Sequence, residues 1–506
     1  MADRRSYTEI VSRGQALQRP DPAVNPLITW LLLSLCVLSL IWPALWNGYP
    51  IVFSDSGTYL SQATHRYLGW DRPVFYSLFI FPLHLGLTTW PVILVQSCLT
   101  VLVLDRTRRA FGVSRWWLFP LTAFLAVTTS LPWIVSELMP DLFTPLLVLL
   151  LSLLVFSQSY FRRWQRIAMT ALAAFMIATQ QSSVPLAIAF LATVLPLRWI
   201  AVRLRTGPRS NPEATSAMLA PLLAPGLAIV AMVLVNAIGF GRVSLSPFGN
   251  VFVLARVIYD GPGMTVLRRE CPASGWRLCP YLDRFPPTSD EFLWEKTSPI
   301  MLAGGHKAVS ADADAIIHAT MQAEPMRLAA ATWDNALQQL TRFASGDGLE
   351  AWPSQVGSWI DADFPLWEST AFHNALQQTG TLAVPRALGL LHRVTALAGI
   401  AAAVVLLPVA WRRRHAAAWF LAGSLLTLLL GAAITGGLST PHDRYQSRIV
   451  WLPAAMAFLS VPALIRRRPG HDVEREECFP SSVYVSAHGT RTRAAHAKRP
   501  PLVVSA

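Results

Sequence analysis

The sequence predicts an all-α protein that crosses a membrane many times, and three observations lead to this class. The chain has 506 residues, of which 53% are hydrophobic and only 14% charged, with a mean hydropathy of +0.41. Such a chain has too little polar material to cover a water-soluble globule of its length. Apolar stretches close to the roughly 20 residues that a spanning helix needs recur along it. Arginines cluster in alternate connections between these stretches, which is the pattern that sets membrane topology.

The apolar stretches divide the chain into two transmembrane modules. We expect about ten spanning helices, at 27–47, 90–104, 116–133, 142–158, 167–181, 184–201, 217–239, 387–410, 416–436 and 449–465. The first seven form an N-terminal module over 27–240, after a cytoplasmic segment 1–26, and the last three form a C-terminal module over 387–465. The tail 466–506 mixes Arg, His, Ser and Pro without periodicity, which predicts a disordered cytoplasmic extension.

The distribution of basic residues predicts the orientation. Arginine-rich connections such as 106–115, 162–166 and 412–414 alternate with connections that hold few basic residues. Because cytoplasmic loops carry the excess of Lys and Arg, we expect an integral, multi-pass protein of the plasma (inner) membrane with both termini in the cytoplasm. The net charge of +13 comes from these clusters rather than from one basic face. We therefore expect membrane lipids as partners and no nucleic acid.

The apolar run 73–88 is the exception in this scheme. As a further span it would place the arginines of 106–115 outside and invert every later loop. We therefore predict an interfacial or re-entrant helix that begins at Pro73, within a first outer loop at 48–89.

The polar region 241–386 is long enough for a small domain and falls on the non-cytoplasmic side of the predicted topology. Its punctuation predicts a mainly helical extracytoplasmic lobe. Within it, Cys271 and Cys279 are close enough in sequence for a disulfide on the oxidising side, which we favour over a pair of free thiols. Two cysteines without a second pair of ligands do not meet the four-ligand demand of structural zinc.

The first candidate chemical group is Asp55, in the segment Phe53-Ser-Asp-Ser-Gly-Thr-Tyr59 just after the first span. A partly desolvated carboxylate at a membrane boundary can act as a general base toward a hydroxyl group. Equally, an acid between two serines can cap the helix that follows. For Asp71 and Arg72, just before Pro73, a local ion pair at a helix start is the favoured interpretation.

Two further segments carry charges at span boundaries. Glu137 and Asp141 lie in the short loop between the third and fourth predicted spans. Because charges that face lipid are costly, we expect these two acids to face a cavity or a partner. The alternative is that Asp141 only begins the next helix, whose N-terminal dipole favours an acid. Before the last span, Thr440-Pro-His-Asp-Arg-Tyr-Gln-Ser-Arg448 carries Arg444 and Arg448. Guanidinium groups bind phosphate bidentately, which suits a lipid headgroup. The alternatives are snorkelling to headgroups or pairing with Asp443.

The arrangement resembles a family. A first span followed by an outer loop with Asp55-Ser-Gly-Thr-Tyr59 and Asp71-Arg-Pro-Val-Phe-Tyr76 looks like the first luminal loop of the GT-C glycosyltransferases, which include protein O-mannosyltransferases and lipid A aminoarabinose transferases. Asp141 and the Arg444-Tyr445 pair match the second acidic motif and the late Arg-Tyr element of that superfamily. The chain departs from it in having a single acid at Asp55 and a large insertion at 241–386.

The resemblance implies a GT-C-like fold and glycosyl transfer from a polyprenyl-phosphate-linked sugar on the outer face. Consistent with a donor other than a nucleotide, the sequence has no Walker-type phosphate loop. In this interpretation Asp55 is the base, Arg444 and Arg448 stabilise the departing lipid phosphate, and Asp141 positions the acceptor or a divalent cation. The residues expected to bind substrate are Arg444, Tyr445, Arg448, Asp71, Arg72, Glu137 and His442. The alternatives are a transporter or flippase of lipid-linked sugars, and a polymerase or ligase of surface glycans.

Overall fold

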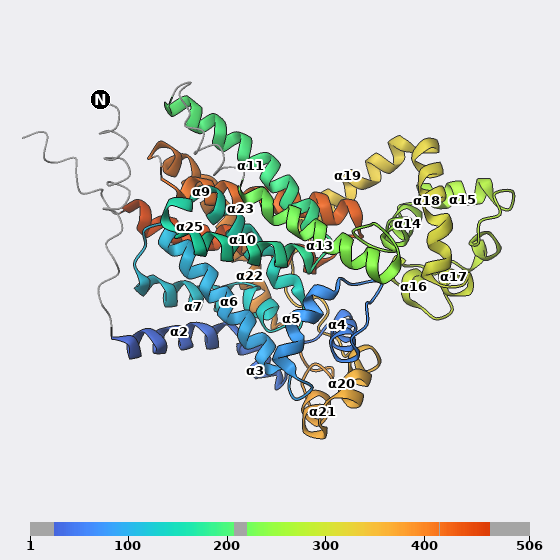
Figure 1. Ribbon diagram of the computed structural model, residues 1–506, viewed down its shortest axis with the longest axis horizontal. Coiled ribbons are helices and arrows are strands. Elements are labelled where there is room, and N and C mark those ends of the chain that lie inside the picture. The colour runs from blue at the N-terminus through green and yellow to red at the C-terminus, as the bar shows by residue number, and fades with distance from the viewer. Residues whose placement is uncertain (1–24, 207–219, 414, 466–506) are drawn as a thin grey trace, which may run out of the picture. The chain divides into compact units, whose positions relative to one another are not determined.

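The computed structural model describes residues 25–206, 220–413 and 415–465. The predictions for the first 24 residues and for the tail 466–506 lie outside this range. Within it, every regular element is a helix, apart from one isolated β-bridge between Ile51 and Glu137. The predicted all-α class is confirmed (Figure 1).

Six helices of the described residues are long and apolar enough to cross a membrane. They are α6 (Trp90–Ala110), the Ser183–Ala201 part of α11 (Ser183–Thr206), Ala220–Phe240 with α13 (Leu223–Phe240), α22 (Arg386–Arg412), α23 (Ala417–Leu438) and Asp443–Ile465 with α24 (Asp443–Ser447) and α25 (Leu452–Ile465). The chain therefore has the make-up of a helical, multi-pass membrane protein.

The expected number of about ten spans is not confirmed, because four of the expected stretches form shorter helices. The stretch 27–47 breaks into α2 (Pro26–Leu40) and α3 (Trp42–Asn47), and 116–133 breaks into α7 (Leu118–Thr128) and α8 (Leu131–Val135). The other two become α9 (Phe143–Phe156) and α10 (Arg163–Ala178). Prolines at the first turns of α3 and α8 accompany the breaks. The 14 residues of α9 rise only about 21 Å, against a hydrocarbon core of about 30 Å.

The helix α9 lies in the interior of the helical bundle formed by the described residues. Each of its residues from Phe143 to Val155 is buried, against α10, α23 and α6 among others. Close helix packing around this core uses small residues: a Cβ on Gly399 of α22 would lie 2.6 Å from the Cβ of Ala454 on α25. The apolar character of α9 thus reflects burial in protein, which hydropathy cannot distinguish from contact with lipid.

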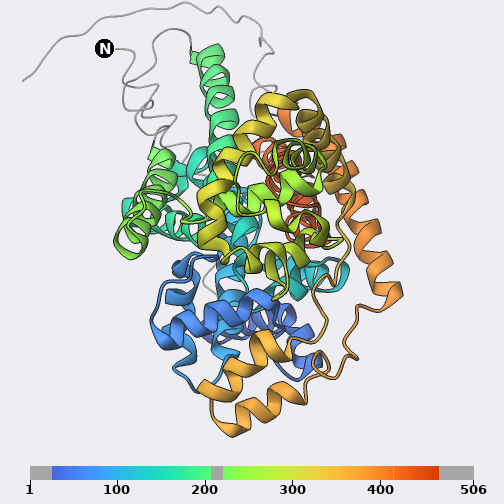
Figure 2. The ribbon, with the colours of Figure 1, turned by 90° about the vertical axis from the view of Figure 1, so that its right-hand side faces the viewer.

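The region 241–386 is mainly helical, as predicted, and it has three parts (Figures 1 and 2). The first is a small unit with its own hydrophobic core, made by α14 (Gly249–Tyr259), α15 (Pro262–Glu270), α16 (Ser289–Trp294), α17 (Pro299–Leu302) and α18 (His306–Ala323). The structure joins Cys271 and Cys279 in it by a disulfide. The second is α19 (Pro325–Thr341), which packs along α23.

The third part, with the π-helical turn Pro353–Gly357, α20 (Ser358–Asp363) and α21 (Leu366–His373), packs on the loop 48–89. Glu368 accepts hydrogen bonds from the Tyr49 hydroxyl at 2.8 Å and from the backbone N–H of Thr89 at 2.8 Å. Gln377 pairs with both the N–H and the C=O of Val52. These buried bonds clamp both ends of the loop.

The loop 48–89 itself contains α4 (Ser54–His65) and α5 (Val74–His84). With 11 residues, α5 rises about 16 Å, which is too short for a full crossing. Its Tyr76 and Ile80 are buried, and the Phe79 ring packs edge-on against Phe143 of α9 at 5.3 Å. The helix is thus packed into the protein, and its interfacial placement remains a prediction.

Candidate functional site

The first turn of α4 places Asp55. Just before it, the backbone of Ile51 pairs with the segment 136–138, through bonds to the C=O of Ser136 and from the N–H of Leu138. Ser56 Oγ accepts a hydrogen bond from the N–H of Phe53 and donates one to the C=O of Leu138. Ser56, and not Asp55, therefore satisfies the start of the helix. The carboxylate of Asp55 is left to face other charges.

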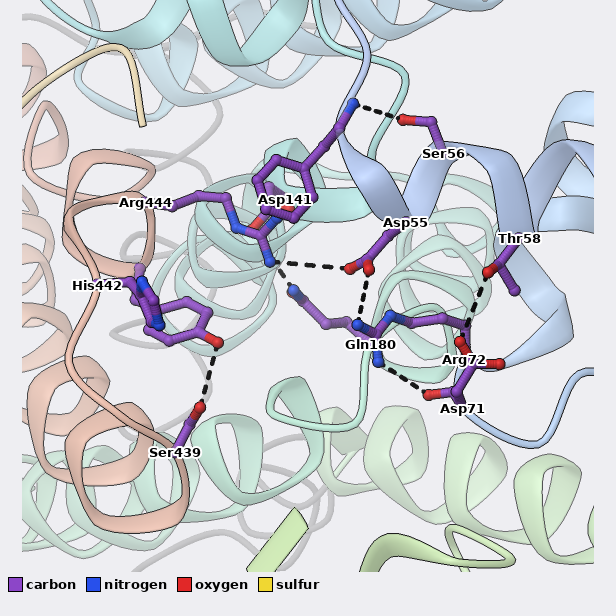
Figure 3. Close-up of polar contacts among 12 residues, drawn as sticks. Asp55, Ser56, Thr58, Asp71, Arg72, Asp141, Gln180, Ser439, His442 and Arg444 are labelled. Carbon is purple, nitrogen blue, oxygen red and sulfur yellow. Dashed lines mark hydrogen bonds and ion pairs between the residues drawn. The ribbon is translucent and has the colours of Figure 1, made fainter. Parts of the chain in front are cut away.

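Asp55 lies between two arginines (Figure 3). Arg72 Nη2 donates to Asp55 Oδ1 at 2.7 Å, and Arg444 Nη2 lies 3.9 Å from Asp55 Oδ2. The guanidinium of Arg444 also stacks 3.9 Å above the ring of Phe53, an arrangement that holds a cation in place. One carboxylate and two guanidinium groups, from the loop 48–89 and from the distant segment 440–448, thus form the centre of the site.

Arg72 does not form the local ion pair expected with the carboxylate of Asp71. It donates to the backbone C=O of Asp71 and directs its other nitrogen to Asp55, while the Asp71 carboxylate lies 3.5 Å from the Thr58 hydroxyl. Burial raises the pKa of Asp71 above its ordinary value, an effect that the charge of Arg72 opposes. Burial alone would lower the pKa of Arg72, but the carboxylates of Asp55 and Asp71 outweigh it and raise that pKa. Arg72 is therefore a permanent cation.

Asp141 and Arg448 form a separate, deeper ion pair. Arg448 Nη1 donates to Asp141 Oδ1 at 2.6 Å, with side-chain exposures of 3% and 1%. The Gln180 amide lies 3.5 Å from the same oxygen. Asp141 does lie in the first turn of the short helix Pro140–Leu142, but its carboxylate pairs with Arg448 rather than serving only that turn. The pair braces the 140–142 turn against the start of the last helical stretch, so Arg448 has its partner already.

The remaining residues of the segment 440–448 frame Arg444. The ring of Tyr445 lies 5.7 Å from the guanidinium of Arg444 and 5.4 Å from that of Arg448. The carboxylate of Asp443 accepts from the N–H of Ala344, so the alternative pairing of Arg444 with Asp443 is not what the structure has. The backbone N–H of His442 donates to the side-chain Oε1 of Gln339 on α19, and the backbone C=O of His442 accepts from Nε2 of the same side chain. These bonds join the two segments, while the imidazole lies 3.1 Å from the Thr440 hydroxyl, and its role in substrate binding stays a prediction.

Glu137 lies in the same pocket as Arg444. It is buried, and it lines a pocket together with Arg444 and Asp347. Burial, followed by the negative charge of Asp141, raises the pKa of Glu137 to about 8. Asp347 accepts a hydrogen bond from the N–H of Arg444 at 2.9 Å.

A second pocket lies beside Arg72. Its polar lining comes from Arg72, Gln181 and Asn236, and its apolar lining includes Met232 and Val235 of α13. The outer face of α13, one of the six candidate spans, exposes Leu227, Val230, Leu234 and Ile238. The pocket therefore joins a fixed cation to a helix with an apolar exposed face.

No protein-family model, no curated protein and no solved structure matches this chain. Its function is therefore inferred from the site.

Sequence reasoning missed three residues of the site. Trp70 inserts into an aromatic cluster of the region 241–386, with its ring 4.1 Å from His306 and 5.8 Å from Trp294. The Phe53 ring stacks under the guanidinium of Arg444, and the Asp347 carboxylate accepts a hydrogen bond from the backbone N–H of Arg444. A tryptophan directly before Asp71-Arg72 was the one available signal, whereas nothing local to Asp347 points to Arg444.

The described residues contain no group of three or more His, Cys, Asp or Glu side chains that could hold a metal ion. Use of a divalent cation thus stays a prediction.

Proposed function

We propose that this chain is a membrane glycosyltransferase that moves a sugar from a polyprenyl-phosphate-linked donor to an acceptor hydroxyl on the extracytoplasmic face. The observation that carries the proposal is the carboxylate of Asp55, held between Arg72 and Arg444 beside a pocket bounded by the apolar helix α13. A base flanked by two phosphate-binding groups at a lipid-facing helix suits transfer from a lipid phosphate.

The donor fits the pocket beside Arg72. Its lipid chain would lie along the exposed apolar face of α13, and its phosphate would reach the guanidinium of Arg72, which lines the same pocket. A guanidinium offers two parallel N–H donors to phosphate oxygens. The Arg72 guanidinium lies 5.9 Å from the Trp294 ring, and the Trp294 ring packs against Trp70 at 5.8 Å.

The reaction is an inverting displacement at the anomeric carbon. Asp55 accepts the proton of the acceptor hydroxyl, whose oxygen forms the new bond to the anomeric carbon as the bond to the phosphate oxygen breaks. The electron pair leaves with the lipid phosphate, where Arg72 and Arg444 stabilise the added charge. Because a phosphate offers Arg72 a second acidic partner, donor binding loosens the Arg72–Asp55 bond and frees the base.

This assignment changes one role expected from the family resemblance. Arg448 is committed to Asp141 in a buried pair, while Arg72 contacts Asp55 directly. We therefore assign the phosphate contacts to Arg72 and Arg444, and a bracing role to Arg448 and Asp141.

The test is sugar transfer in proteoliposomes supplied with a panel of polyprenyl-phosphate sugars. Asp55→Asn keeps the size of the side chain and removes the base, so turnover should fall by about 10²- to 10⁴-fold with donor binding retained. Arg72→Ala should weaken donor binding. The control is Asp314→Asn, an exposed acid on α18, which should transfer at the wild-type rate.

Two results would contradict the proposal. Wild-type turnover in Asp55→Asn would remove the base from the mechanism. Movement of intact lipid-linked sugar across the bilayer, without consumption of any donor, would favour a flippase.

A further inference from the structure

The pocket on the far side of Arg444 has a lining of its own. It lies between the segment 130–137 and the turn at Ser345-Gly-Asp347, and its polar walls include Glu137, Asp347 and Arg444. Trp133 and Ile134 contribute apolar surface. Arg444 therefore borders this pocket and Asp55 at once, just as Arg72 borders Asp55 and the pocket beside α13.

Three of the residues that line this pocket carry polar groups that lack partners. Glu137 is 7% exposed, and its carboxyl group makes no hydrogen bond or ion pair among the described residues. Trp133 is 5% exposed, and its indole Nε1 has no hydrogen-bond partner within the described ranges. The Nη1 of Arg444 is likewise buried and unpaired there. Buried polar groups without partners are costly, so such a set indicates a ligand.

Resting on the proposed function, we infer that this pocket binds the acceptor, a neutral compound with neighbouring hydroxyl groups such as a glycan or polyol, through Glu137, Asp347, Trp133 and Arg444.

The mixture of unpaired donors and acceptors selects hydroxyl groups. A hydroxyl both donates and accepts, so it can satisfy the carboxyl of Glu137 and the N–H of Trp133 together. An anion would be repelled by Asp347 and would leave the acceptors unpaired. A cation would leave the N–H groups of Trp133 and Arg444 unpaired, and the raised pKa of Glu137 makes that residue a weak attractor of cations at neutral pH. Trp133 adds an apolar face.

The arrangement also places the reacting groups. With the donor phosphate on Arg72 and on Nη2 of Arg444, and the acceptor beside Nη1 of Arg444, Asp55 lies between the two arginines that border the pockets. An acceptor hydroxyl that extends from this pocket past Arg444 contacts Asp55 before it contacts the donor. The order of contacts is the one that general base catalysis requires.

The experiment measures binding without donor, on the full chain in nanodiscs. The probes are methyl glycosides of neutral sugars and inositol, followed by saturation-transfer NMR, with glucosamine and glucuronate as the charged comparisons. Octyl glycosides form a second arm that distinguishes a lipid-carried acceptor, which should bind more tightly in this form, from a soluble one, which should not. We expect neutral probes to bind and glucuronate not to bind.

Matched variants locate the binding. Glu137→Ala and Asp347→Ala should each weaken it by about tenfold or more, as for lost hydrogen bonds to acidic groups. Glu295→Gln, an exposed acid in the region 241–386, should leave binding unchanged. Because Glu137→Ala removes a buried side chain, Glu137→Gln provides a better-folded variant that should weaken binding less.

The failures of the two proposals are distinguishable. If no neutral probe binds the wild type, or if binding is unchanged in both Glu137→Gln and Asp347→Ala, the acceptor pocket is wrong even when sugar transfer is observed. If neutral probes bind as expected but no lipid-phosphate donor is consumed, the pocket stands as a glycan site and the transferase proposal fails.

Discussion

Replacing Asp141 by Asn tests whether this acid braces the structure or takes part in the chemistry. The change keeps the shape of the side chain and removes its charge. It leaves the guanidinium of Arg448, which is 3% exposed, without the charged partner that Nη1 contacts at 2.6 Å, since the amide oxygen of Asn accepts a hydrogen bond but carries no charge. Gln180 is the other side chain near that oxygen, at 3.5 Å, and it is uncharged.

The expected magnitude follows from burial. Removing one partner of a buried ion pair costs about 3–5 kcal/mol because the other charge stays buried and uncompensated. Replacing both members by apolar residues of similar size avoids this cost and is often neutral or stabilising. The double variant Asp141→Leu with Arg448→Met should therefore recover most of the stability that Asp141→Asn loses.

The assay is equilibrium unfolding in mixed micelles with an increasing mole fraction of SDS, read by circular dichroism. The control is Arg269→Gln, which breaks an exposed ion pair with Glu270 whose side chains are 53% and 43% exposed. Such a surface pair contributes about 0–1 kcal/mol, so the control should unfold close to the wild type. If Asp141→Asn unfolds like the control, or if the double variant is less stable than Asp141→Asn, the bracing role is wrong. Loss of sugar transfer with unchanged stability would instead make Asp141 part of the reaction.

Three further results are expected. Trp70 packs against Trp294, which lies under the Arg72 guanidinium, so Trp70→Ala should loosen Arg72 and weaken binding of a polyprenyl-phosphate sugar by about tenfold. Trp70→Phe should restore the binding, and equal affinity of the two variants would exclude a role of Trp70 in positioning Arg72. The native state holds the proton of Glu137 up to a pKa of about 8, whereas the unfolded state releases it near 4.5, so the free energy of unfolding should fall as pH rises between these values. Glu137→Gln should flatten that part of the pH profile of stability. A fall of the same size in the variant would contradict the raised pKa of Glu137. For topology, cysteines at the exposed positions Arg109 and Lys296 should be labelled by impermeant maleimide from the cytoplasmic and the opposite side respectively; labelling of position 109 from outside would invert the predicted map.

The membrane class and the segments that meet at the candidate site were predictable because their signals are local. Apolar composition and charge alternation indicate a helical membrane protein whatever the packing. The short segments around Asp55, Glu137 and Arg444 were identified because charges next to apolar spans need a reason. The same local reasoning brought Cys271 and Cys279 together across a separation of 8 residues.

The number of spans could not be predicted in the same way. Hydropathy measures the tendency of a segment to leave water, and α9 leaves water for the interior of the protein. Breaks of the helix at Ile41 and at Ser130 depend on few residues within otherwise apolar runs. The stretches 27–47 and 116–133 therefore look continuous in composition and are divided in space.

The partners of the charges were decided by the tertiary structure. Arg448 reaches Asp141 across 307 positions of sequence, and Arg72 reaches Asp55 rather than its neighbour Asp71. These pairings depend on how helices pack, because a side chain meets whatever the neighbouring element presents at its depth. The sequence by itself determined that this protein is helical, apolar and charged at a few boundaries. The packing alone decided that Asp55 lies between Arg72 and Arg444, because only the folded bundle brings the segment 440–448 against the loop 48–89.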